Sequence, residues 1–173
     1  MYHLTAFNLS FQRIMSKSVF FLQKVFFNFL FVSCFTSRSY KFNTSKVTDM
    51  GEMFWVCKNL TTLDVSNFDT SKVTYMRFMF EYCERLTTLD LSKFSTSNVT
   101  DMIRMFCDCK NLKTIYVGDG WNTSKVENSE GMFKNCTNLV GGKGTTFDSE
   151  ITDKTRAKVD GGKENPGYFT AKK

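Results

Sequence analysis

The stretch "SKVTYMRFMFEYCERLTTLDLSKF", from Ser71 to Phe94, decides the fold because close copies of it precede and follow it. The preceding copy, "SKVTDMGEMFWVCKNLTTLDVSNF", begins at residue 45, and the next, "SNVTDMIRMFCDCKNLKTIYV", begins at residue 97. A fourth copy, "SKVENSEGMFKNCTNL", begins at residue 124. One cysteine recurs at spacings of 26, 26 and 27 residues in these copies: Cys57, Cys83, Cys109 and Cys136. A fixed period of this length is typical of a repeat architecture.

Each repeat contains the signals of a strand, a turn and a short helix. Leu63 and Val65 alternate with polar residues, as in a strand with one buried face. The following "DTSKVT" is rich in side chains that bond nearby backbone, which is typical of a turn. We expect Thr74 to cap a short helix, in which apolar residues recur at three- and four-residue intervals. These residues are Met76, Met79, Phe80 and Cys83.

Stacked units of this kind predict an α/β fold, because no single unit can bury its apolar face alone. The prediction is a right-handed solenoid with short parallel strands on one face and short helices on the other. Residues 43–140 hold about four units of 26 residues, and residues 141–173, which leave the pattern, are expected to cap the stack.

Residues 1–42 form an apolar and basic N-terminal segment. Its stretch 18–35, "SVFFLQKVFFNFLFVSCF", suits a secretory signal or membrane anchor. Lys24 interrupts that stretch, so a surface-lying or capping helix is one alternative. Another is that the segment is not part of the mature protein. Cys34, after "FVS", loosely resembles the cleavage site of a bacterial lipoprotein.

The formal net charge of +6 lies mostly outside the repeats. Residues 1–42 carry five Lys or Arg and no acid, whereas residues 43–140 carry eleven Lys or Arg and twelve Asp or Glu. A nucleic-acid-binding protein should carry a basic stripe on its folded face. The near-neutral repeats therefore argue against a nucleic-acid partner.

The repeat resembles that of the BspA-like leucine-rich-repeat surface proteins of bacteria, whose unit reads close to "LDLSxFDTSxVTxMxxMFxxCxxL". Here the chain reads "LDVSNFDTSKVTYMRFMFEYCERL" from Leu63 and "LDLSKFSTSNVTDMIRMFCDCKNL" from Leu89. The resemblance covers residues 43 to about 170. It implies a leucine-rich-repeat-like solenoid that is secreted or held at the cell surface. It also implies adhesion to a protein or glycan of a host or a neighbouring cell. Membrane association through residues 18–35 is suggested by the apolar composition of that stretch, not by the resemblance.

The recurring cysteines are interpreted as buried structural thiols. A zinc site needs ligands that converge on one point, whereas these cysteines follow one another along the stack. A disulfide between neighbouring units needs Cα atoms within about 6 Å, closer than helices usually pack, and it stays an alternative. Methionine and phenylalanine at helical spacing are typical of a core, so no cofactor or metal is predicted.

Alternate strand residues are expected to project outward in rows along the stack, and these rows are the candidate partner-binding site. The rows contain Thr62, Asp64 and Ser66 from one unit, Thr88, Asp90 and Ser92 from the next, and Thr114 and Tyr116 from a third. Exposed sheet faces of solenoids are common binding surfaces. Carboxylates opposite one another repel, so Asp64 and Asp90 would need hydrogen bonds, a cation or a basic ligand.

The sequence contains no constellation of a nucleophile with a base, and no paired carboxylates in a predicted pocket. It therefore predicts a non-enzymatic binding or adhesion module, secreted or at the cell surface, that recognises a protein or glycan through its strand-bearing face. Two alternatives stay open. One is a structural spacer or fragment of a longer array without a ligand, and the other is a calcium-dependent adhesion module that uses Asp64 and Asp90.

Overall fold

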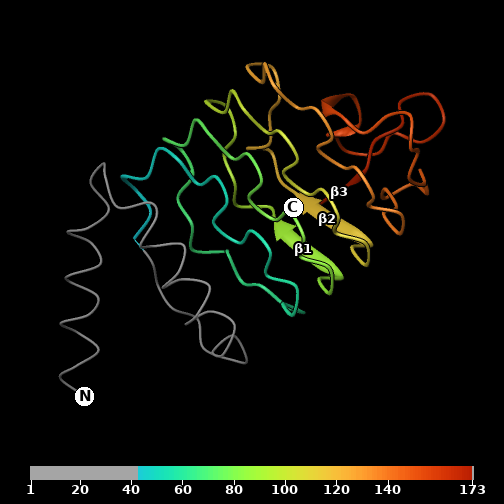
Figure 1. Ribbon diagram of the computed structural model, residues 1–173. Coiled ribbons are helices and arrows are strands. Elements are labelled where there is room, and N and C mark those ends of the chain that lie inside the picture. Colours follow the sequence, from blue (N-terminus) through green and yellow to red (C-terminus); the bar gives the residue numbers. More distant parts are fainter. Residues whose placement is uncertain (1–42, 173) are drawn as a thin grey trace. The chain divides into compact units, whose positions relative to one another are not determined.

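The computed structural model describes residues 43–172, which contain three strands and one short helix. The elements are β1 (Thr88–Leu91), β2 (Thr114–Val117), the 3-10 helix η1 (Lys154–Arg156) and β3 (Phe169–Ala171). The strands form one parallel sheet in the order β1-β2-β3 (Figure 1). Within this part of the chain no helix is long and apolar enough to cross a membrane. The predictions for the N-terminal segment, including the anchor over 18–35 and Cys34, fall outside the described residues.

Consecutive repeats lie side by side in matching register. On the sheet, Asp90 pairs with Tyr116, which occupies the same position one repeat later. A second row of parallel bridges runs along the stack at another position of the repeat. It joins Asp49, Tyr75, Asp101 and Asn128. Residues that are one period apart in the sequence therefore lie next to each other in adjacent repeats, which are termed coils.

The predicted short helices are replaced by consecutive tight turns. Within residues 76–83, the amides of Met79, Glu81 and Cys83 donate to carbonyl oxygens three residues earlier, at 3.3, 3.2 and 3.1 Å. The amides that alternate with these, those of Phe78 and Phe80, donate to the carbonyl oxygens of Ile103 and Met105 in the next repeat, at 2.8 and 2.9 Å. The equivalent segments 50–57, 76–83, 102–109 and 129–136 are together termed the turn ladder.

Backbone conformation explains why the turn ladder is not helical. Phe78 and Tyr82 have φ of 57° and 60°, in the left-handed region that a right-handed helix excludes. Thr74 does not cap a helix either, because its hydroxyl donates to the carbonyl oxygen of Thr48 in the preceding repeat, at 3.1 Å. Packed helices lie about 8–10 Å apart, whereas paired strands lie about 4.8 Å apart. Turns let the ladder side match the close spacing of the sheet side.

A column of phenylalanine rings runs through the core. Phe54, Phe80, Phe106 and Phe133 stack in sequence with centroids 5.5, 5.7 and 5.5 Å apart and planes within 12° of parallel. Such ring pairs contribute roughly 0.5–1.5 kcal/mol each beyond their burial. Met79 beside them is fully buried, as predicted. The core is therefore continuous from one repeat to the next.

Three buried threonines, Thr44, Thr70 and Thr96, each join one repeat to the next. The Thr70 hydroxyl donates to the carbonyl oxygen of Ser95 at 2.9 Å and accepts from the Ser95 amide at 2.8 Å. Thr44 makes the same pair of hydrogen bonds with the backbone of Asp69, and Thr96 with that of Asn122. Asp69 bonds locally to the amide of Ser71 at 3.0 Å, as expected for a turn. Within "DTS", the aspartate shapes the turn and the threonine joins the coils.

The segment after the fourth repeat covers the last coil and supplies its strand. β3 pairs with β2, and Phe169 at its start is fully buried. Tyr168 packs edge-on against Phe133 at 5.1 Å. Asp160 anchors the segment by accepting four hydrogen bonds from Lys143, Thr145 and Gly162. Burial raises the pKa of Asp160, but these bonds outweigh it and hold the pKa well below its ordinary value.

Candidate functional site: the strand face

The outward side chains of the sheet form a polar surface, termed the strand face. Its members are Thr88 and Asp90 from β1, Thr114 and Tyr116 from β2, and Thr170 from β3. Leu89 and Ile115, which alternate with them, are fully buried. Pairing places Thr88 opposite Thr114, and Tyr116 between Asp90 and Thr170. The structure thus brings together four of the eight predicted partner-binding residues.

The other four predicted residues lie beside this surface. Thr62, Asp64 and Ser66 are exposed, and among the described residues the sheet begins at β1, so their repeat contributes no strand to it. Ser92 follows β1, and its amide donates to Asp90 Oδ1 at 3.0 Å. The Ser66 amide donates to Asp64 Oδ1 at the same distance. Each aspartate therefore closes the turn after its strand position with one oxygen.

Lys172 joins the strand face from outside the repeats. Its Nζ donates to Asp90 Oδ2 at 2.5 Å and lies 5.5 Å from the centre of the Tyr116 ring. Its amide also donates to the Val117 carbonyl oxygen at 2.8 Å, which continues the pairing of β3 with β2. Sequence reasoning missed Lys172 because it lies 82 residues from Asp90 and outside the periodic pattern.

Hydrogen bonds keep both aspartates of the rows charged. Bonds from Ser66 lower the pKa of Asp64, against weaker effects of burial and the nearby Asp90. Burial raises the pKa of Asp90, but bonds from Lys172 and Ser92 outweigh it, so the pKa of Asp90 lies below its ordinary value. The same bond raises the pKa of Lys172. At neutral pH the strand face therefore presents the Asp90 carboxylate and the Lys172 ammonium, with the Asp64 carboxylate beside it.

The cysteines of the repeat do not contribute to this surface. The thiols of Cys83, Cys109 and Cys136 donate to the carbonyl oxygen of a phenylalanine in the preceding repeat, as Cys83 does to Phe54 at 3.2 Å and Cys109 to Phe80 at 3.0 Å. The Cys107 thiol donates to Asp108 Oδ2 at 3.3 Å. Burial raises the pKa of Cys57 to about 11 and that of Cys109 to about 12. The five described cysteines are free, and thiols this far from ionisation are poor nucleophiles.

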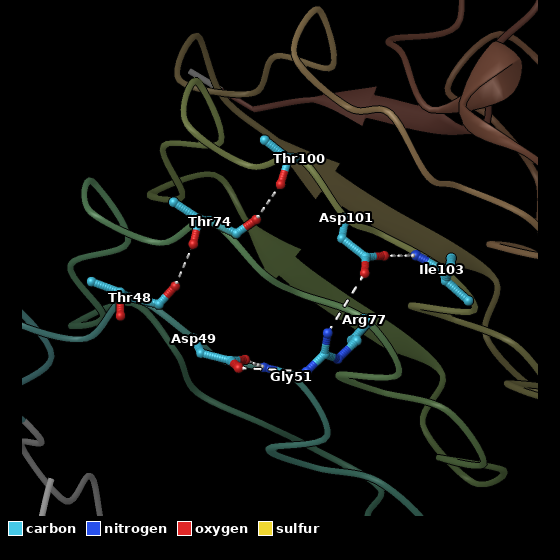
Figure 2. A network of polar contacts seen from close by, with 8 residues as sticks. All are labelled: Thr48, Asp49, Gly51, Thr74, Arg77, Thr100, Asp101 and Ile103. Atoms are coloured by element: carbon cyan, nitrogen blue, oxygen red, sulfur yellow. Dashed lines mark hydrogen bonds and ion pairs between the residues drawn. The ribbon is translucent and has the colours of Figure 1, made fainter. Parts of the chain in front are cut away.

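A second polar cluster lies along the row of bridges (Figure 2). The guanidinium of Arg77 lies 3.8 Å from Asp49 and 3.8 Å from Asp101, and it stacks 5.3 Å from the Tyr75 ring. Asp49 and Asp101 also accept backbone amides two residues later. Their equivalent positions in the repeat could have indicated this cluster. Arg77 links three coils, because it lies between an aspartate of the preceding repeat and one of the following repeat. Both carboxylates are therefore already engaged within the protein.

The described residues around Asp90 do not form a set of ligands for a divalent cation. Asp90 is engaged by Lys172, and no group of three or more possible metal ligands gathers among the residues that the structure describes. Calcium usually takes six to eight oxygen ligands. The charged group that pairs with Asp90 is the Lys172 ammonium.

Comparison with known proteins defines the family. Neither the curated proteins nor the solved structures include a match to this chain. One family model matches residues 20–145, which is more than half of the chain. The chain therefore belongs to the family described as "Mycoplasma protein of unknown function, DUF285".

Proposed function

We propose that this protein is a non-enzymatic binding module, secreted or held at the cell surface, that recognises a protein or glycan through its strand face. Within the family we propose a BspA-like, leucine-rich-repeat type of right-handed solenoid. The repeat motif and the matching register of adjacent coils support this proposal.

The composition of the strand face is the observation that carries the proposal. Threonine hydroxyls, a carboxylate and a tyrosine ring point outward from neighbouring strands. Tyrosine is enriched in protein interfaces, because its ring buries apolar area while its hydroxyl bonds a partner. The turn ladder differs, because its backbone amides are used between coils and its acidic Glu81 is buried against Arg104.

Reversing one charge on each face tests the proposal. Wild type, Asp90→Lys and Glu130→Lys are compared for binding to immobilised extracellular-matrix proteins and glycans. Glu130 is exposed on the turn ladder, so its variant carries the same change of charge on another face. We expect Asp90→Lys to lose binding and Glu130→Lys to keep it, with thermal unfolding confirming that both variants fold.

A spacer without a ligand predicts a different result. In that case neither the wild type nor either variant binds any immobilised partner, which would contradict the proposed function. Loss of binding in Glu130→Lys but not in Asp90→Lys would move the interface to the turn ladder.

A further inference from the structure

We propose that the strand face contains a site for the ammonium group of a lysine side chain of a protein partner, and that Lys172 occupies this site in the free protein. The proposal rests on the proposed function and names the chemistry that the strand face recognises. It is carried by the positions of Asp90, Tyr116 and Lys172 relative to one another.

The carboxylate of Asp90 is held ready for a cation. Its Oδ1 accepts the Ser92 amide at 3.0 Å, which fixes the side chain at the end of β1. Its Oδ2 is left for the Lys172 ammonium, at 2.5 Å. A hydrogen bond between an ammonium and a carboxylate is charge-assisted and roughly twice as strong as one between neutral groups.

The ring of Tyr116 provides the second wall of the site. Tyr116 is the register partner of Asp90 on the neighbouring strand. The Lys172 ammonium lies 5.5 Å from the ring centre, within the roughly 6 Å over which a cation is attracted to an aromatic face. A carboxylate and an aromatic ring on adjacent strands together favour a cationic group over a neutral one.

The exposure of this pair makes Lys172 displaceable. The side chains of Lys172 and Asp90 are 50% and 40% exposed, and exposed ion pairs contribute little to stability. The backbone of the segment is held separately, by the Lys172 amide on Val117 and by the buried Phe169. The ammonium of Lys172 can therefore leave Asp90 while β3 keeps its place in the sheet.

Asp64 extends the negative charge beyond the occupied position. It holds the equivalent place one repeat earlier, and its Oδ1 is fixed by the Ser66 amide in the same way. No ion pair with Asp64 occurs among residues 43–172. A partner that offers two lysines could pair with both aspartates, and this makes a short oligolysine the suitable probe.

Binding of tetralysine to the full chain tests the inference by isothermal titration. Removing Lys172 by Lys172→Ala, or by Lys172→Met, which keeps the apolar stem, should raise the affinity for tetralysine. If Lys172 fills the site about nine-tenths of the time, the increase is about tenfold. The double variant Asp90→Asn with Lys172→Ala should lose this gain, and tetralysine with acetylated side chains should not bind.

Lys58→Ala is the matched control. Lys58 also pairs with a carboxylate, Glu84 at 3.3 Å, and lies 5.8 Å from a tyrosine ring, that of Tyr82. Its loss changes the net charge equally, so it reports any general attraction of tetralysine to a less basic protein. We expect Lys58→Ala to leave the affinity close to that of the wild type, because among residues 43–172 no backbone amide fixes the Glu84 carboxylate as the Ser92 amide fixes that of Asp90.

Three outcomes would overturn the inference. These are an unchanged affinity in both folded Lys172 variants, an equal gain in Lys58→Ala, and a gain that survives Asp90→Asn. The outcome is separable from that of the proposed function. A gain for tetralysine without any binding to matrix proteins or glycans overturns the proposed function alone, whereas matrix binding without the tetralysine gain overturns this inference alone.

Discussion

At the scale of single residues, Met79 provides a direct test of how much the buried core stabilises the repeats. It is fully buried beside the phenylalanine column. We expect Met79→Ala to reduce the free energy of unfolding by about 2–5 kcal/mol, because a large buried side chain is replaced by a cavity. Urea denaturation measures the change, with Lys72→Ala as an exposed control in the same repeat. A midpoint equal to that of the control would show that Met79 is not buried.

The threonine of the "DTS" motif is expected to matter through hydrogen bonds rather than volume. Thr70→Val keeps the shape but leaves the part-buried amide and carbonyl oxygen of Ser95 without this partner. The expected cost is about 1–3 kcal/mol in the free energy of unfolding. Thr62→Val makes the same change at an exposed position. Equal urea midpoints for the two variants would contradict the role given to Thr70.

Because the thiols are buried, we expect the free energy of unfolding to fall at alkaline pH. Burial raises the pKa of Cys109 from 9.0 to about 12, so its contribution is fully present below pH 9.0 and is lost as the pH rises towards 12. The reason is that unfolding lets the thiol ionise. The stability difference between wild type and Cys109→Ala, from urea midpoints on either side of pH 9.0, should move in favour of the variant as the pH rises. A difference independent of pH would place the thiol in contact with water.

Among the elements, the turn ladder depends on residues with positive φ. Gly131 has φ of +59°, and a Cβ there would meet only ordinary contacts, at 3.6 Å from Arg104 and 3.7 Å from Lys134. Conformation rather than space should therefore decide a substitution. We expect Gly131→Val to cost about 1–2 kcal/mol in unfolding free energy, and Gly131→Asn to cost less, since asparagine tolerates this region. Equal urea midpoints would argue against the left-handed turn.

The turn ladder also marks the limit of what the sequence predicts about local structure. The three- and four-residue spacing of Met76, Met79, Phe80 and Cys83 correctly indicated which side chains are buried. That spacing does not distinguish a helix from consecutive turns, because both place these residues on one side. The choice depends on hydrogen bonds to the next repeat, which are a property of the stack rather than of one segment.

The candidate site was predictable only where it belongs to the repeat. Alternation in "LDLS" placed Asp90 outward, and the period placed Tyr116 beside it, as the register shows. The first repeat has the same alternation around Asp64, yet it forms no strand with β1. Lys172 belongs to the non-repeating segment, so no periodicity relates it to Asp90. Long-range pairing of that kind depends on how the final segment folds back.

In the described part of the molecule, the stacking of similar repeats assigns packing to the inward positions and leaves the outward positions available for binding a partner. Inward positions recur because each coil packs on a copy of itself, and hydrogen bonds between coils use the threonines and the turn amides. The outward positions of the strand face are not constrained in this way, and they change from Asp90 to Tyr116 between adjacent strands. A binding function is therefore expected to depend on this face.

Photo-crosslinking identifies the face that a partner contacts. Benzoylphenylalanine is placed at Thr88 on the strand face in one protein and at Lys134 on the turn ladder in another, both at exposed positions. Each is irradiated with the matrix protein or glycoprotein that the wild type binds. We predict a crosslinked product from the position of Thr88 and none from that of Lys134. A product from Lys134 alone, or equal products from both positions, would contradict recognition through the strand face.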